Sequence, residues 1–342
     1  MSSVVPENQD APGVPERNAL QGVRVLVTGG LGFVGSNLVH ACLDAGAIVT
    51  VLDNATPGSG ANPANLAGRE GSVTIRRDDI RDAVAVCEAV AGQDVVFHAA
   101  AYTSHPLSMQ DPFTDVEVNC RGTLNLLEAL RRFNPGAKLV HVGTSTQTGP
   151  ARRDRVDEDH PEFPADIYSA NKTAAEKYVL IYGRAYGLRV AVVRLSNTYG
   201  PRACIGNPDL GFLNYFVGLA LRGETLRVFG DGSQRRTVVY VDDAVDALLR
   251  AALSPRTDPA VWFAAGDEPL TVAEIARALV ETIGGALAFA PWPAGRRAIE
   301  IGDAVIDNRR IRAELGATFS VRLAEGLART RDFYRPRLKD YL

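Results

Sequence analysis

Three glycines, Gly29, Gly32 and Gly35, directly follow the apolar run of residues 23–27. That run is rich in β-branched residues, and the residues after Gly35 favour a helix. A buried strand that passes through a glycine turn into a helix is typical of a pyrophosphate site, because the helix N-terminus offers free N–H donors and positive partial charge. We expect Gly29 to form the turn, Gly32 to admit the phosphates and Gly35 to let helix and strand pack closely.

An acidic residue at the end of the next apolar run supports a dinucleotide site. Residues 48–52 are apolar and end in Asp53, about 20 residues past the glycines, where a ribose-binding carboxylate is expected. Its negative charge would repel a 2′-phosphate, and no arginine follows within the next three residues. The sequence therefore favours NAD over NADP.

A second motif, Tyr168 followed by Lys172, points to acid–base chemistry on an alcohol. The chain has ten tyrosines and only four lysines, so chance predicts about 0.12 pairs at this spacing. Residues four apart on a helix share one face. A tyrosine acts as a base only after losing its proton, and lowering its pKa from about 10 toward 7 requires roughly 4 kcal/mol. A nearby ammonium and the nicotinamide ring could supply that.

The order of apolar runs predicts a Rossmann-type α/β fold, a doubly wound parallel sheet with a smaller C-terminal α/β lobe for the substrate. Apolar runs at residues 23–27, 48–52, 73–75, 95–97, 139–142 and 190–195 alternate with helical stretches. We expect an extension without fixed structure at residues 1–20, a cofactor domain at 21–196 whose sheet is completed by 236–265, and a substrate lobe at 197–235 and 266–342. In that lobe Thr271 and Glu274 should form a capping box.

Together these motifs resemble the extended short-chain dehydrogenase/reductase superfamily, in its nucleotide-sugar epimerase/dehydratase branch, and most closely enzymes of the UDP-glucose 4-epimerase type. Further matching segments are residues 79–82, 98–101, 119–123, 194–202 and 230–243. The resemblance covers nearly the whole chain after about residue 22 and implies NAD as cofactor and a nucleotide-diphosphate sugar as substrate.

The resemblance also implies roles for individual residues. It makes Thr144, Tyr168 and Lys172 catalytic, with Thr144 bonding the sugar alcohol and Lys172 binding ribose and lowering the pKa of the tyrosine. It assigns NAD binding to Gly29, Gly32, Phe33, Val34, Gly35, Asp53, Asn54, Asp79, Ile80, Ala99, Ala100, Asn119, Tyr168 and Lys172. It assigns substrate binding to Ser145, Thr146, Asn197, Phe212, Leu213, Phe229, Arg236 and Arg297, with Arg296 as an alternative to Arg297.

The segment after Thr144 indicates which reaction to expect. Dehydratases and decarboxylases of this family usually carry an acid two positions on, and here that residue is Thr146. Without the acid, oxidation at C4 followed by reduction from the opposite face is favoured, which predicts a 4-epimerase. The usual Val-Tyr pair before the glycine is replaced by Gln147 and Thr148, which affects the expected pocket wall. Glu300 likewise stands where the family usually has an arginine.

Three alternatives remain open from the sequence. A 2-epimerase of the CDP-tyvelose type is similar over parts of residues 111–129 and 211–216. A 4,6- or 5,6-dehydratase is possible if Asp154, Asp157 or Glu158 supplies the missing acid. A non-catalytic NAD-binding regulator would share the fold, because fold does not imply function.

Composition narrows the partners. A net charge of −3 with interspersed signs forms no basic stripe, so we expect no nucleic-acid partner. The four cysteines and five histidines show no metal-ligand spacing, so we expect no metal and a reducing, cytoplasmic location. No apolar stretch reaches the length of a membrane span. Apolar residues on several faces of the helices at 112–132 and 167–186 predict a homodimer.

Overall fold

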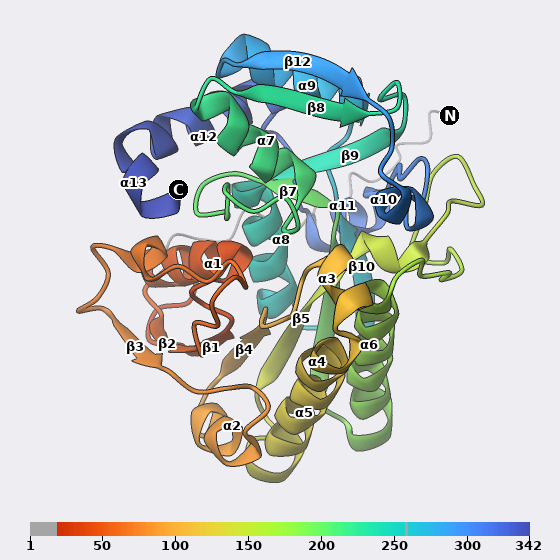
Figure 1. Cartoon of the computed structure of the whole chain (residues 1–342). Helices are drawn as coiled ribbons and strands as arrows, with labels where there is room; N and C mark the ends of the chain where they lie inside the picture. The colour runs from red at the N-terminus through yellow and green to blue at the C-terminus, as the bar shows by residue number, and fades with distance from the viewer. Residues whose placement is uncertain (1–18, 257–258) are drawn as a thin grey trace, which may run out of the picture.

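A computed structural model describes residues 19–256 and 259–342 of the chain. Its centre is a seven-stranded sheet with the order β10-β6-β5-β4-β1-β2-β3 (Figure 1). Every pair of neighbouring strands in it is parallel. The strands are β1 (Arg24–Thr28), β2 (Ile48–Leu52), β3 (Val73–Arg76), β4 (Val95–His98), β5 (Lys138–Thr144), β6 (Arg189–Leu195) and β10 (Ala260–Ala264). The predicted doubly wound parallel sheet is confirmed.

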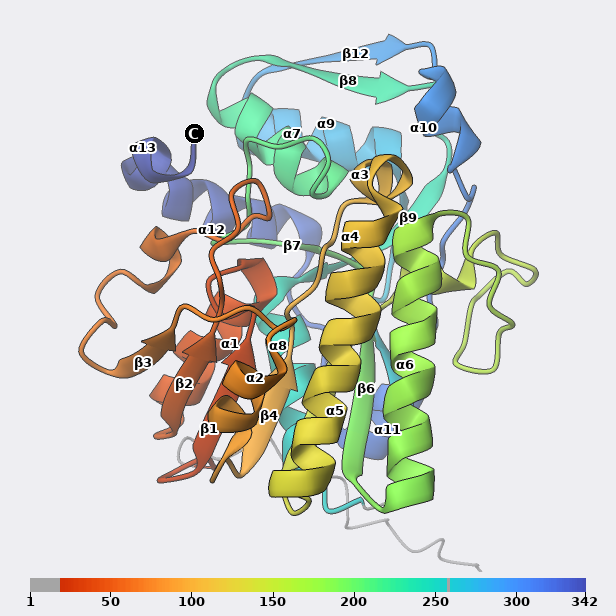
Figure 2. The ribbon, with the colours of Figure 1, turned by 60° about the horizontal axis from the view of Figure 1, so that its bottom comes forward.

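Helices cover both faces of this sheet because each strand presents apolar side chains on both sides. One face packs against α1 (Phe33–Asp44), α8 (Val241–Leu253) and α11 (Arg309–Leu315). The other packs against α2 (Ala83–Val90), α5 (Gly122–Phe133) and α6 (Ile167–Tyr186). In Figure 2, α5 and α6 lie side by side. The short α4 (Pro112–Asp115) and a π-helical segment, η2 (Val116–Arg121), lead into α5.

The strand register brings distant residues to one edge of the sheet. Thr28 pairs with His98, His98 pairs with His141, and Thr144 pairs with Leu195. Ligands of parallel α/β sheets bind at the carboxyl ends of the strands, where these residues lie. The short helix α3 (His105–Gln110) follows β4 at the same edge and contacts α6 (Figure 2).

A smaller lobe sits above that edge (Figure 1). It has a three-stranded sheet, β11-β9-β7, and a two-stranded sheet, β12-β8. Its strands are β7 (Asn197–Tyr199), β8 (Thr225–Phe229), β9 (Arg235–Tyr240), β11 (Pro269–Thr271) and β12 (Ala286–Ala290). Its helices are α7 (Phe212–Leu221), α9 (Val272–Thr282), α10 (Ala294–Ala298), α12 (Leu323–Tyr334) and α13 (Leu338–Tyr341). The expected capping box of Thr271 and Glu274 at the start of α9 is confirmed.

The chain crosses between the two parts more often than the sequence indicated. Within residues 236–265 only β10 joins the large sheet, whereas β9 belongs to the small one. Helix α11, expected in the lobe, packs against β10 and α8, because Ile311 and Leu315 are buried in the core of the large sheet. Residues 1–18 of the expected extension lie outside the described residues. Leu20 is 1% exposed and belongs to the folded core.

Candidate active site

A cavity of about 330 Å³ at the carboxyl edge of the sheet gathers most residues expected to bind the cofactor. Its walls come from the turn after β1, the ends of β2 and β4, the loop after β3 and the start of α6. The expected cofactor residues on its walls are Gly29, Gly32, Phe33, Val34, Gly35, Asp53, Asn54, Asp79, Ile80, Ala99, Ala100, Tyr168 and Lys172.

The glycine turn has the geometry that a dinucleotide needs. Gly29 has a φ of +71°, and a Cβ there would lie 2.7 Å from the backbone nitrogen of Ala100. A Cβ at Gly35 would lie 2.0 Å from the carbonyl oxygen of Gly29, so helix α1 begins directly against the turn. No side chain can be added at either position without moving backbone. The backbone at the start of α1 therefore borders the cavity directly. Its free N–H groups can bind a pyrophosphate there.

Asp53 lies at the end of β2 and is 8% exposed. One carboxylate oxygen accepts a hydrogen bond from Leu31 N at 2.9 Å and the other from Ala55 N at 2.8 Å. Burial raises the pKa of this carboxyl, and the two backbone bonds and the nearby Arg77 offset part of that effect. Each oxygen retains a lone pair for a ribose hydroxyl. Arg77 follows directly after β3, the strand that pairs with β2, so its charge could not be predicted from the residues next to Asp53 in the sequence.

Two of the expected cofactor residues stabilise the cavity wall. Asn119 does not line the cavity: its side chain accepts from Tyr102 N and donates to Tyr102 O, both at 3.0 Å, so it holds the loop after β4. Asp79 lines the cavity and accepts from Asn54 at 2.7 Å and from Arg81, and the Arg81 bond is the largest cause lowering the pKa of Asp79 to about 2. Asp79 is therefore ionised at neutral pH.

Thr144 and Tyr168 meet where this cavity ends. Thr144 is the last residue of β5, Tyr168 lies in the first turn of α6, and the Thr144 side chain hydrogen-bonds the phenol. Burial and the charges of Asp115 and Asp166 raise the pKa of the phenol above its usual range, and the bond to Thr144 offsets only part of this. Tyr168 is therefore protonated in the protein alone, so ionising it requires a positive charge from a bound group.

Lys172 lies one turn along α6, as the spacing predicted, but its ammonium faces the sheet. It donates to Val142 O at 2.8 Å and lies 3.2 Å from His141 Nε2. Burial lowers its pKa to about 8, against the opposing effects of Glu176 and Asp115. Lys172 remains predicted to lower the pKa of Tyr168 in the NAD-bound enzyme. It still lines the cavity, where it can bind a ribose hydroxyl.

A second cavity, of about 910 Å³, adjoins the first and extends between the large sheet and the lobe. Consecutive residues of the chain line the two cavities: Thr144 lines the first, and Ser145 and Thr146 line the second. The other expected substrate residues that line it are Asn197, Phe212, Phe229 and Arg236. Leu213 does not line it and packs in the core of the lobe at 2% exposure.

The cations of this cavity differ in part from those expected. Arg236 is held by Glu300 at 2.7 Å, so the acid that replaces the family's arginine pairs with the predicted phosphate-binding residue. Arg296 lines the cavity and forms an ion pair with Asp209 on the opposite loop. Arg297 does not line it: its guanidinium stacks over Trp292 at 5.9 Å. Of these two arginines, only Arg296 lines the cavity.

Thr146 is surrounded by hydroxyl groups. Its Oγ1 lies 3.0 Å from the hydroxyl of Thr144 and 3.0 Å from that of Ser169. No carboxylate comes from the segment of residues 144–146. Asp154, Asp157 and Glu158, the acids weighed from the sequence, line neither cavity: Asp154 is exposed, Asp157 pairs with Arg153, and Glu158 accepts from Phe263 N at 2.9 Å. None of the three is therefore positioned to supply the missing acid, so the condition on which the dehydratase alternative depended is not met.

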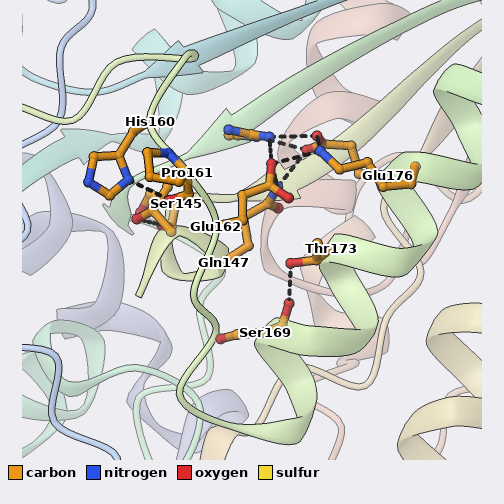
Figure 3. Close-up of polar contacts among 11 residues, drawn as sticks. Ser145, Gln147, His160, Pro161, Glu162, Ser169, Thr173 and Glu176 are labelled. Carbon is orange, nitrogen blue, oxygen red and sulfur yellow. Dashed lines mark hydrogen bonds and ion pairs between the residues drawn. The ribbon is translucent and has the colours of Figure 1, made fainter. Parts of the chain in front are cut away.

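Gln147 and Thr148 point away from the substrate cavity. Gln147 is fully buried and donates to Glu176 at 2.8 Å, and Arg194 binds the same carboxylate through two nitrogens. Figure 3 shows the side chains of Gln147, Glu162 and Glu176 gathered beside α6. Thr148 instead donates to Ser145 O at 2.8 Å. The departure from the family pattern at Gln147 therefore adds to a buried ionic network, and Ser145 and Thr146 line the cavity wall.

Several titratable residues of the substrate cavity were not predicted from the sequence, and two of them, His105 and Asp166, form a pair beside Tyr168. His105 Nδ1 lies 2.8 Å from Asp166 Oδ2. The imidazole packs edge-on against the ring of Tyr168, with ring centroids 4.9 Å apart and planes at 84°. Asp166 also caps α6 by accepting from Ser169 N at 2.8 Å, the one role its position in the sequence could have indicated.

The parallel sheet, the glycine cradle and the Thr144, Tyr168 and Lys172 set define a nicotinamide-dependent enzyme that acts on an alcohol or ketone. The comparisons with known proteins narrow this class. The model of the NAD dependent epimerase/dehydratase family matches residues 25–263. The chain belongs to this family, and its cofactor is NAD.

Several relatives extend over nearly the whole chain. A UDP-glucose 4-epimerase from Mycolicibacterium smegmatis is 35% identical over 319 residues, covering 92% of this chain and 99% of that protein. A dTDP-glucose 4,6-dehydratase from Streptomyces niveus is 33% identical over 320 residues, covering 92% and 93%. A crystal structure of UDP-glucose 4-epimerase from Thermus thermophilus with NAD has a TM-score of 0.81 at 34% identity, covering 92% of this chain and 100% of that one. Among the described residues, no helix is both long and apolar enough to span a membrane.

Proposed function

We propose that this protein is an NAD-dependent nucleotide-sugar 4-epimerase. The relatives named above carry out both epimerisation and dehydration at nearly equal identity, so the choice between the reactions depends on the site. The observation that carries the proposal is Thr146, whose hydroxyl bonds Thr144 and Ser169 where a dehydratase of this family usually has an acid. Hydroxyl groups can orient a sugar alcohol, but they are poor proton donors to a leaving hydroxide.

In this reaction Tyr168 takes the proton from the C4 hydroxyl, and Thr144 hydrogen-bonds the same oxygen. NAD supplies the acceptor, and later the donor, of the hydride at C4. The 4-keto sugar would then turn about its diphosphate link within the large cavity, so that C4 is reduced on its opposite face. Tyr168 returns the proton to O4. The diphosphate would be held by Asn197, Arg236 and Arg296, because arginine forks match the geometry of phosphate oxygens. Phe229 and Trp292, which line this cavity with ring centroids 5.5 Å apart, would contact the base.

The proposed cycle needs an ionised Tyr168. Its pKa is raised in the protein alone, and the positive charge of a bound, oxidised nicotinamide would favour the ionised phenol. Tyrosinate should therefore form only when oxidised NAD is bound. Absorbance at 295 nm, compared between the wild type and Tyr168→Phe, measures this ionisation without any sugar.

Proton NMR in D₂O with a panel of UDP-, dTDP-, GDP- and CDP-hexoses tests the reaction. A C4 epimer that keeps its original hydrogen at C4 is expected. Tyr168→Phe should keep NAD bound and lose turnover; full activity in this variant would remove Tyr168 as the base. Loss of water with deuterium at C6 would instead make the protein a 4,6-dehydratase.

The 4,6-dehydratase is the second candidate because of one observation. His105 and Asp166 place two titratable groups on the wall of the substrate cavity beside Tyr168, although no acid follows Thr144. An imidazolium can protonate a leaving hydroxyl. The NMR experiment above distinguishes the two reactions by their products.

A further inference from the structure

His105 and Asp166 form a pair that the 4-epimerase reaction does not use. The two residues are 61 positions apart in the chain and come together because α3 packs against the start of α6. Two hydrogen bonds fix this packing: Tyr168 N donates to Ser108 Oγ at 3.0 Å, and Ser108 Oγ donates to His105 O at 2.8 Å. The imidazole is therefore held against the proposed base.

Asp166 determines which nitrogen of His105 carries the proton. Its carboxylate accepts from His105 Nδ1 at 2.8 Å, from Ser169 N at 2.8 Å and from Ser169 Oγ at 3.0 Å. Burial raises the pKa of this carboxyl, but the bonds from His105 and Ser169 outweigh it and the pKa is lowered overall. An ionised Asp166 can only accept, so Nδ1 holds the hydrogen and Nε2 of a neutral imidazole is left as a base.

Nε2 is free to act on a ligand. Within the part of the chain that the structure describes, no protein group hydrogen-bonds it, and the side chain is 34% exposed on the wall of the 910 Å³ cavity. The other charged side chains that line this cavity come from the lobe and the loops that close it: Asp209, Glu224, Arg227, Arg236, Arg296 and Glu300. A carboxylate that orients an imidazole whose second nitrogen faces the substrate is a recurrent acid–base arrangement.

We propose that His105, oriented by Asp166, is a second acid–base group of this site, which removes and returns a proton at the sugar carbon next to C4 while C4 is a ketone. The inference rests on the proposed oxidation at C4. It gives the enzyme a further activity, enolisation of the 4-keto sugar, for which Tyr168 alone would not suffice.

The step balances without another reactant. Nε2 takes the proton from the ring carbon beside the ketone, the electrons of that C–H bond form a C=C bond, and the carbonyl electrons move to O4. Tyr168, which holds the proton from the C4 hydroxyl, and Thr144 stabilise the resulting enolate by hydrogen bonding. The imidazolium then returns a proton to the same carbon. Because His105 is partly exposed, its Nε2 proton exchanges with solvent, so the carbon acquires deuterium in D₂O.

The test uses the NAD holoenzyme and the sugars that it converts, in D₂O, with proton NMR of each ring position. The wild type should incorporate deuterium at C3 or C5 while C4 keeps its hydrogen. In His105→Gln the ratio of this exchange to C4 epimerisation should fall at least about tenfold, since acid–base groups contribute roughly 10²–10⁴ in rate. Asp166→Asn, which retains a capping side chain, should lower the same ratio. His40→Gln, a histidine that lines neither cavity, is the control and should leave it unchanged.

Each outcome separates this proposal from the proposed function. C4 epimerisation with no deuterium at C3 or C5, or exchange that persists in His105→Gln, overturns the role of His105 and leaves the 4-epimerase intact. Exchange that depends on His105 and accompanies loss of water supports His105 and overturns the 4-epimerase.

A substrate-free measurement covers the case in which no sugar of the panel is converted. Nitrogen-15 NMR of labelled histidines in the holoenzyme, assigned with His105→Gln, should show His105 protonated at Nδ1. This preference should weaken in Asp166→Asn. A His105 protonated only at Nε2 would overturn the proposal, because its base would then face Asp166 instead of the cavity.

Discussion

Lys172 should cost the folded protein stability at neutral pH, and replacing it by Met should reveal this cost. The side chain is 4% exposed, and burial lowers its pKa from 10.5 to about 8. That change corresponds to roughly 3 kcal/mol disfavouring the charged form in the folded state. Two hydrogen bonds, to Val142 O and His141 Nε2, hold the ammonium group in place. In this position Lys172 lines the cofactor cavity.

The sign of the pH dependence follows from where each state binds the proton. The unfolded chain keeps Lys172 protonated up to about pH 10.4, whereas the folded chain releases that proton near pH 8. Between these values the unfolded state binds more protons, so this residue makes the free energy of unfolding rise with pH, by about 3 kcal/mol in total. At pH 7 the free energy of unfolding of Lys172→Met rises by this amount, because no charge is buried. It falls by about 1–3 kcal/mol for each of the two acceptors, Val142 O and His141 Nε2, that loses its hydrogen bond.

Urea unfolding of the wild type and Lys172→Met at pH 7 and pH 10 measures this contribution. All other titrating groups are common to both proteins, so their effects cancel in the comparison. The unfolding free energy of the wild type should rise by about 2.5 kcal/mol relative to the variant over this interval. If the two proteins show parallel pH dependence, Lys172 is not buried as a charge, and the reasoning about its environment is wrong.

Three further outcomes are expected. Gly35→Ala should destabilise the protein by roughly 1–3 kcal/mol or more and weaken NAD binding, because its Cβ would lie 2.0 Å from a carbonyl oxygen; thermal unfolding and calorimetric titration measure both. Asp53→Asn should lower the ratio of NAD affinity to NADP affinity, because it removes the charge that repels a 2′-phosphate. The same affinity ratio in the variant as in the wild type would contradict this. We predict a homodimer that forms through α4, η2, α5 and α6, because the side chains of Phe113 and Ile181 on these helices are 80% and 52% exposed. Light scattering should give twice the chain mass of 36.6 kDa. The double variant Phe113→Glu, Ile181→Glu should give the mass of the monomer.

The sequence by itself determined the features that depend on local pattern. The glycine turn, the alternation of strands and helices, the capping box at Thr271 and the helix at residues 167–186 were all predicted, because each follows from residues within a few turns of one another. The spacing of Tyr168 and Lys172 placed both on one helix for the same reason. The resemblance added the residues of the cofactor cavity, since their motifs are contiguous in the chain.

Only the tertiary structure decided how residues far apart in the chain combine. His105 and Asp166 belong to different helices, and no spacing rule joins positions 61 apart. The burial of Gln147 beside Glu176 and the choice of Arg296 over Arg297 likewise depend on which face a side chain presents after packing. The pKa of Lys172 follows from its depth beneath the cavity. Packing sets burial and the direction of side chains, and these determine the charges and hydrogen bonds available for catalysis.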